Sequence, residues 1–125
     1  MKFIVIVAVC AAVAFAFACT KREDSFVQET VDLNGASPQD AYVALNCSRC
    51  HGTELQGQRT APALTGLSSK WTEDDLVAYL RDPAAARAAN PRLAHVAEQY
   101  VIDMPAYPHT EETVLRGLAG WILAR

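Results

Sequence analysis

Side chains that bind metals are scarce in this sequence, and the scarcity limits the sites that it can build. Its 125 residues include four cysteines, three histidines and two methionines. A structural zinc site needs four ligands, but the chain has one close pair of cysteines and no second pair to complete such a set. It also has no phosphate loop, no set of Ser, His and Asp, and no carboxylates paired for acid–base catalysis. The few soft ligands that are present therefore carry the functional argument.

Positive charge is also in short supply. The chain has 11 Lys and Arg residues against 14 Asp and Glu residues, which gives a formal net charge of −3. Removal of Lys2 with an N-terminal leader would make the charge more negative. Because nucleic-acid binding depends on clustered Lys and Arg, this composition argues against a nucleic-acid partner. It is compatible with docking onto basic patches of a redox protein, and equally with an ordinary acidic surface.

The N-terminal stretch is apolar and uncharged from Phe3 to Ala18. It is shorter than the ~20 residues of a membrane-spanning helix, and it fits the apolar region of a signal peptide. We therefore expect residues 1–18 to be a signal peptide and residues 19–36 to be a lipid-anchored or flexible tether. Residues 37–125 are then one exported domain.

A cysteine follows the apolar stretch directly. Ala16-Phe17-Ala18-Cys19 resembles a bacterial lipoprotein box, in which cleavage precedes the cysteine and the cysteine is acylated. Lipidation of Cys19 would account for a residue that is otherwise a lone exported thiol. Two other outcomes stay open: an uncleaved leader that serves as the anchor, and ordinary cleavage to a soluble periplasmic form. We expect an exported protein on the periplasmic side, anchored to the membrane as a lipoprotein.

The strongest motif is Cys47-Ser48-Arg49-Cys50-His51. Two cysteines separated by two residues and followed by histidine are typical of covalent attachment of c-type haem. Each thiol can add to one vinyl group, and His51 is then held against the iron as the proximal ligand. We therefore predict one haem c, covalently bound through Cys47 and Cys50. The alternatives are half of a zinc site, a thioredoxin-like redox pair and a structural disulfide.

The loop that follows the motif offers two further candidates, Pro62 and Leu64. A histidine that binds a metal usually donates its other ring N–H to a backbone carbonyl or a carboxylate. Pro62 could present that carbonyl, and Leu64 could pack on the porphyrin. An ordinary loop proline and an ordinary core leucine are equally good readings of these two residues.

A second proline-containing loop carries Met104. It is the one methionine left after removal of the leader, and a thioether is a soft iron ligand that raises the haem potential. Pro105 and Pro108 stiffen the loop, which helps to hold a weak Fe–S bond. We predict Met104 as the second axial ligand. His109 is the nearest alternative, and His95 is either a rival ligand or a partly exposed helix residue.

Helix-start signals recur along the chain, where Ser, Thr or Asn precedes proline or acidic residues. They predict helices from Ser37 to about Cys47, from Thr72 to Asp82, from Pro83 to Asn90, from Asn90 to about Tyr100 and from Thr110 to Arg125. No strand pattern interrupts them.

Together these residues resemble a single-haem class I cytochrome c of the bacterial, exported kind. The resemblance covers Ser37 to Arg125 and rests on the attachment motif, the Pro62–Leu64 loop, Met104-Pro105-Ala106-Tyr107 and Leu118-x-x-Trp121. It implies an all-α fold, with three core helices plus one or two short helices wrapped around one covalently bound haem. The family's first and last helices cross near one haem edge, which would bring Tyr42 or Val43 against Leu118 and Trp121.

The resemblance implies one-electron transfer in a periplasmic or membrane-attached respiratory chain, and no enzymatic reaction. With His51 and Met104 on the iron, no open position remains for a substrate. The expected partners are a redox protein that donates the electron and one that accepts it, and we expect a monomer. The alternatives are a haem module that binds a small gas ligand, with Met104 off the iron, and a dithiol protein without haem.

Replacing the predicted lipidation site tests the expected export route. Cys19→Ala should move the protein from the membrane fraction to the soluble periplasm, or leave it unprocessed, because no thiol remains to be acylated. Fractionation and the mass of the mature chain measure this. An unchanged fraction and mass would contradict lipidation and favour ordinary cleavage.

Overall fold

The structure, a computed structural model, describes residues 32–125. The expected signal peptide, Cys19 and most of the expected tether therefore lie outside the described residues. The described helices are α1 (Pro38–Ala44), α2 (Cys47–His51), the short 3₁₀-helix η1 (Leu67–Ser69), α3 (Glu73–Arg81), α4 (Pro83–Ala89), α5 (Pro91–Ala97) and α6 (Glu112–Leu123). Within residues 32–125 the only β-type pairing is a single bridge between Gln58 and Ala61, so the expected all-α class is confirmed.

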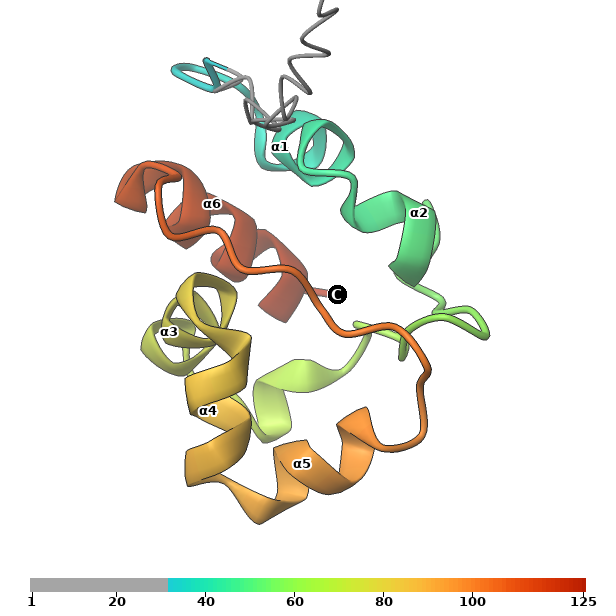
Figure 1. Cartoon of the computed structure of the whole chain (residues 1–125). Coiled ribbons are helices and arrows are strands. Elements are labelled where there is room, and N and C mark those ends of the chain that lie inside the picture. The colour runs from blue at the N-terminus through green and yellow to red at the C-terminus, as the bar shows by residue number, and fades with distance from the viewer. Residues whose placement is uncertain (1–31) are drawn as a thin grey trace, which may run out of the picture.

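The core is built on α6, which lies between α1 and α3 (Figure 1). Leu115 and Leu118 of α6 and Tyr42 of α1 are the largest fully buried side chains. The rings of Tyr42 and Trp121 are tilted, with centroids 5.4 Å apart. The expected crossing of the first and last helices is therefore present. It is made by Tyr42, because Val43 points outward and is 57% exposed.

Side-chain caps explain where several helices begin. The hydroxyl of Ser37 accepts a hydrogen bond from the backbone N–H of Asp40, so α1 begins at Pro38 as expected. Thr72 and Asp75 form a reciprocal capping box at the start of α3. The expectation for the last helix was wrong: Thr110 does not cap it, and α6 begins after Glu111 without a side-chain cap bond.

The first helix is shorter than expected, and this changes the setting of the haem motif. α1 ends at Ala44, and Asn46 then adopts a left-handed backbone conformation with φ 61°. Asparagine tolerates this conformation better than most residues. The motif therefore forms a helix of its own, α2. Likewise α5 ends at Ala97 instead of near Tyr100.

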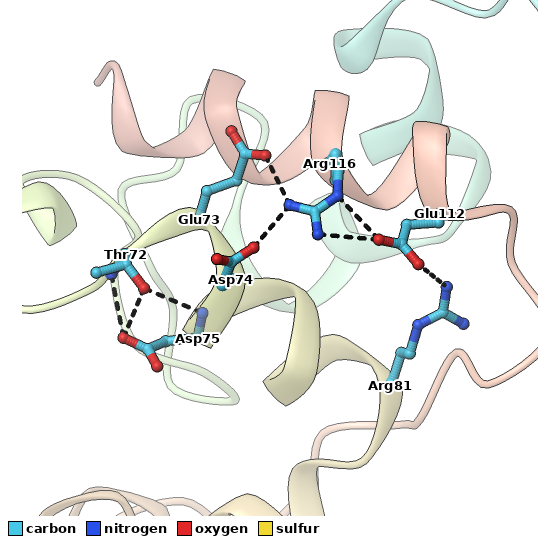
Figure 2. Close-up of polar contacts among 7 residues, drawn as sticks. All are labelled: Thr72, Glu73, Asp74, Asp75, Arg81, Glu112 and Arg116. Atoms are coloured by element: carbon cyan, nitrogen blue, oxygen red, sulfur yellow. Dashed lines mark hydrogen bonds and ion pairs between the residues drawn. The ribbon is translucent and has the colours of Figure 1, made fainter.

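A cluster of ion pairs joins the start of α3 to the start of α6 (Figure 2). Arg116 donates to Asp74 at 2.8 Å, to Glu73 at 3.1 Å and to Glu112 at 2.9 Å. Arg81 adds a longer contact of 3.6 Å to Glu112. Hydrogen bonds to Asp74, Glu73 and Glu112 raise the pKa of Arg116, so it stays charged. The cluster lies on the surface, where it fixes how α3 meets α6.

None of the helices in residues 32–125 has the length and apolar character needed to cross a membrane.

Candidate haem site

A cavity of about 870 Å³ lies inside the ring of helices. Its volume falls within the range of roughly 300–1,000 Å³ that is typical of cofactor sites. Its lining includes all six site residues that the sequence predicts within the described part of the chain: Cys47, Cys50, His51, Pro62, Leu64 and Met104. The cavity thus brings together predicted site residues that are far apart in the sequence: Cys47 and Met104 are separated by 57 positions.

His51 is the last residue of α2 and its side chain is buried, with 6% of the residue exposed. Its Nδ1 lies 2.7 Å from the carbonyl oxygen of Pro62. Because a carbonyl can only accept a hydrogen bond, Nδ1 carries the proton and the lone pair is on Nε2. Burial lowers the pKa of His51, and the hydrogen bond to Pro62 opposes that shift. The ring is therefore neutral near pH 7 and oriented to bind a metal through Nε2.

The carbonyl of Pro62 is held in place by a tight loop. The N–H of Gly57 donates to the carbonyl of His51 at 2.8 Å, so the loop folds back on α2. Gly57 has φ 77°, and a Cβ there would overlap the backbone of Pro62 and Ala63. The N–H of Leu64 then donates to the carbonyl of Leu55 at 2.8 Å. The close approach at Gly57 explains why this position carries no side chain.

Cys47 and Cys50 lie three residues apart on α2, a spacing that places both on one side of the helix. Cys47 is 7% exposed, Cys50 is half-buried, and both are free thiols. Burial raises the pKa of the Cys47 thiol to about 11, so this group is protonated near pH 7. Thr60 donates to the carbonyl of Cys50 at 3.2 Å, which ties the Pro62 loop to the C-terminal end of α2.

Two tyrosine hydroxyls fix the residues on either side of α2, and the sequence analysis did not predict this. Tyr42 donates to the carbonyl of Gly52 at 2.7 Å, and Tyr107 donates to the carbonyl of Leu45 at 2.9 Å. Burial raises the pKa of Tyr42 to about 12 and also raises that of Tyr107, so both stay protonated donors. Tyr107 belongs to the Met-Pro-x-Tyr motif, but the motif does not predict which residue accepts the hydrogen bond from its hydroxyl.

Met104 is half-buried, borders the cavity and packs against the core. The two rival histidines are placed differently. The His95 side chain is 77% exposed and lies 3.8 Å from the carboxylate of Glu98. His109 is exposed, and neither histidine lines the cavity. The structure therefore brings Met104, but not His95 or His109, to the space that His51 borders.

The donor set fits haem c better than it fits zinc. Nowhere in residues 32–125 do three or more His, Cys, Asp or Glu side chains gather as a metal site requires. The cavity instead offers two thiols on one helix, one neutral imidazole and one thioether, set among mostly apolar residues. Thiols can bond covalently to haem, and imidazole and thioether are its usual axial ligands in cytochromes c.

A comparison with protein families agrees with this geometry. The family model described as Cytochrome c matches residues 37–116, more than half of the chain. The matched segment contains both cysteines, His51, the Pro62 loop and Met104. Comparisons with curated proteins and with solved structures gave no match.

The loop geometry predicts different effects of alanine at two glycines. Gly57→Ala should lower the free energy of unfolding more than Gly66→Ala, because the new Cβ at Gly57 meets backbone whereas Gly66 has nothing within 4 Å. Both have positive φ, so a backbone cost of about 1–2 kcal/mol is common to them. Gly57→Ala should also raise the reduction potential, because a displaced Pro62 carbonyl makes His51 a less basic ligand.

Denaturant unfolding and redox titration of the haem-loaded variants measure these two effects. Equal losses of stability with unchanged potentials would show that the loop accepts the Cβ without moving Pro62.

Proposed function

Since this chain belongs to the cytochrome c family, we propose that it carries one electron at a time on a single haem c. In this proposal Cys47 and Cys50 bind the haem covalently, and His51 and Met104 are its axial ligands. The observation that carries the proposal is that these four side chains border one cavity of cofactor size. The haem supplies reversible one-electron exchange between ferric and ferrous iron.

The chain's own residues have separate roles in this proposal. The Pro62 carbonyl keeps the proton of His51 on Nδ1, which leaves Nε2 for the metal. Met104 provides a weak, soft donor that favours the ferrous state and so raises the potential. Leu64, half-buried beside the cavity, excludes water from the porphyrin face. With both axial positions taken by side chains there is no place for a substrate, so we propose a carrier and not an enzyme.

We further propose that the partners are redox proteins, one donating and one accepting the electron, and that the carrier is a monomer. The N-terminal sequence supports a place on the periplasmic side, in a respiratory chain. A lipid on Cys19, outside the described residues, would keep the domain near its membrane-bound partners.

Covalent attachment is tested by removing both thiols. The double variant Cys47→Ala, Cys50→Ala should lose haem on a denaturing gel, because no thioether can form. Haem staining of the gel measures this, with Cys19→Ala as a control that removes a cysteine outside the site and should keep its stain. Staining that persists in the double variant would overturn the proposed attachment.

The sixth position is tested by carbon monoxide binding to the reduced protein. The wild type should bind slowly, because the Fe–S bond must break first, whereas Met104→Ala should bind readily. Met104→His should give a lower potential than the wild type. His95→Ala and His109→Ala serve as controls and should leave the visible spectrum nearly unchanged.

Two outcomes would alter this assignment. A histidine variant that changes the ferric spectrum while Met104→Ala does not would show that the axial ligand is wrong. Immediate carbon monoxide binding by the wild type would favour the second candidate, a module that binds a small gas ligand. One observation favours this second candidate: residues 101–106, which include Met104, make no backbone hydrogen bond to the rest of the described chain.

A further inference from the structure

The segment that carries Met104 is held unevenly at its two ends. After Met104, the N–H of Tyr107 donates to the carbonyl of Leu80 at 2.9 Å, and its hydroxyl donates to the carbonyl of Leu45. Arg81 donates to the carbonyl of Pro108 at 3.1 Å. These bonds tie the downstream end of the loop to α3 and to Leu45, two residues before the haem motif.

The upstream end has far less support. Within the described chain, no backbone N–H or C=O of residues 101–106 takes part in a hydrogen bond. Val101 is fully exposed and so adds no packing, and Ile102, which borders the cavity, is still 54% exposed. One polar contact remains in the described part of the chain: Arg87 Nη1 lies 2.9 Å from Asp103 Oδ1.

The two partners of this ion pair have different surroundings. The Arg87 side chain is only 18% exposed and lies in the last turn of α4, whereas Asp103 is 84% exposed. Arg87 also borders Tyr79: burial raises the pKa of Tyr79, and Arg87 opposes that rise. α4 packs on α3 and on α5, so the guanidinium is a fixed point on the body of the domain. Figure 1 shows the segment between α5 and α6 as a long stretch without helix.

We propose that Arg87 and Asp103 are positioning residues for Met104: their ion pair holds the upstream arm of the loop so that the thioether stays at the metal. This inference rests on the proposed function, because it concerns how firmly one proposed ligand is held. Met104 is adjacent to Asp103, and it lies between this pair and the Tyr107 anchors. Breaking the pair frees one of the two ends and lets Met104 leave more often.

The chain offers a closely matched control for the test. Asp103 and Asp74 each pair with an arginine, at 2.9 Å and 2.8 Å, and their side chains are 84% and 81% exposed. Asp74 belongs to the Arg116 cluster (Figure 2) and does not line the cavity. Asp103→Asn and Asp74→Asn therefore remove the same charge from similarly exposed carboxylates, and only Asp103 lies beside Met104 and borders the cavity. Because both side chains are highly exposed, neither substitution removes a buried contact, and both variants should fold.

The measurement is the rate of carbon monoxide binding to the reduced, haem-loaded protein. Asp103→Asn should bind about twofold to fivefold faster than the wild type, which is the range that the modest strength of an exposed ion pair allows. Asp74→Asn should stay within about 1.5-fold, because Asp74 does not line the cavity. Asp103→Glu keeps the charge and should restore slow binding. Arg87→Gln should also bind faster, and the double variant Arg87→Gln, Asp103→Asn should be no faster than the faster single variant, because both changes break one contact.

The outcomes separate this inference from the proposed function. If the wild type binds slowly and Met104→Ala binds quickly, but Asp103→Asn behaves like Asp74→Asn, the ligation stands and the ion-pair inference is overturned. Arg87 also lines the cavity, so its positive charge would then act on the bound haem directly and not through Asp103. If the single-variant effects multiply in the double variant, the two residues act independently and the inference fails. If the wild type binds at once, Met104 is not a ligand and both proposals fall.

A redox titration, compared with the rate of carbon monoxide binding, separates positioning from a pure charge effect. Loss of a negative charge near the iron raises the potential and leaves the binding rate unchanged. A loosened thioether opens the iron to carbon monoxide, whichever way the potential moves. Faster binding by Asp103→Asn therefore identifies positioning, and a raised potential at an unchanged rate would contradict it.

Discussion

An imidazole that binds a metal must hold its proton on one nitrogen and its ring in one orientation, and here both depend on the contact between His51 and the carbonyl of Pro62. The ring is buried, so the contact is not exchanged for water. The carbonyl is in turn placed by the loop that folds back at Gly57. In the proposed carrier, moving any part of this chain of contacts would change the basicity of His51 as a ligand, and with it the balance between ferric and ferrous iron. The tight loop at Gly57 is therefore part of the site, although it has no side chain to offer.

The cavity and the hydrophobic core are built from the same residues. Tyr107, Leu118 and Ile122 belong to the core and also line the cavity, while Leu64 and Met104 line the cavity and pack against that core. A domain of this size has little other apolar surface to bury. A group that fills the cavity therefore completes the core, and binding it stabilises the folded chain over the unfolded one. For this reason covalent attachment has a structural effect as well as a functional one, because the part of the core that it supplies cannot dissociate.

Much of the site was predictable because its signals are local in sequence. Signals of this kind, each recognised within a few residues, are the Cys47–His51 motif, the caps at Ser37 and Thr72, and Met104, the one methionine besides Met1. The break at Asn46 was missed because the apolar pattern of α1 runs up to Leu45, directly before it, and only the backbone shows the left-handed turn. The acceptors of the Tyr42 and Tyr107 hydroxyls, and the pairing of Arg87 with Asp103, join residues that are 10 to 62 positions apart. Such pairings depend on how the helices pack, and one sequence alone carries no signal for them.

The two sides of the cavity are held by contacts of different kinds. On the His51 side, hydrogen bonds from Tyr42, Tyr107 and Thr60 fix the motif helix and the residues that flank it. On the Met104 side, the ligand lies on an irregular segment whose upstream arm has a single ion pair and exposed apolar residues. Local opening starts where backbone hydrogen bonds are few and contacts are exposed. In the proposed carrier any exchange of ligand should therefore begin at Met104, while His51 and the thioethers keep the haem in place. The proposed carrier would thus keep its haem through the firmly bonded residues around His51, while the more loosely held Met104 segment would set how easily the iron opens.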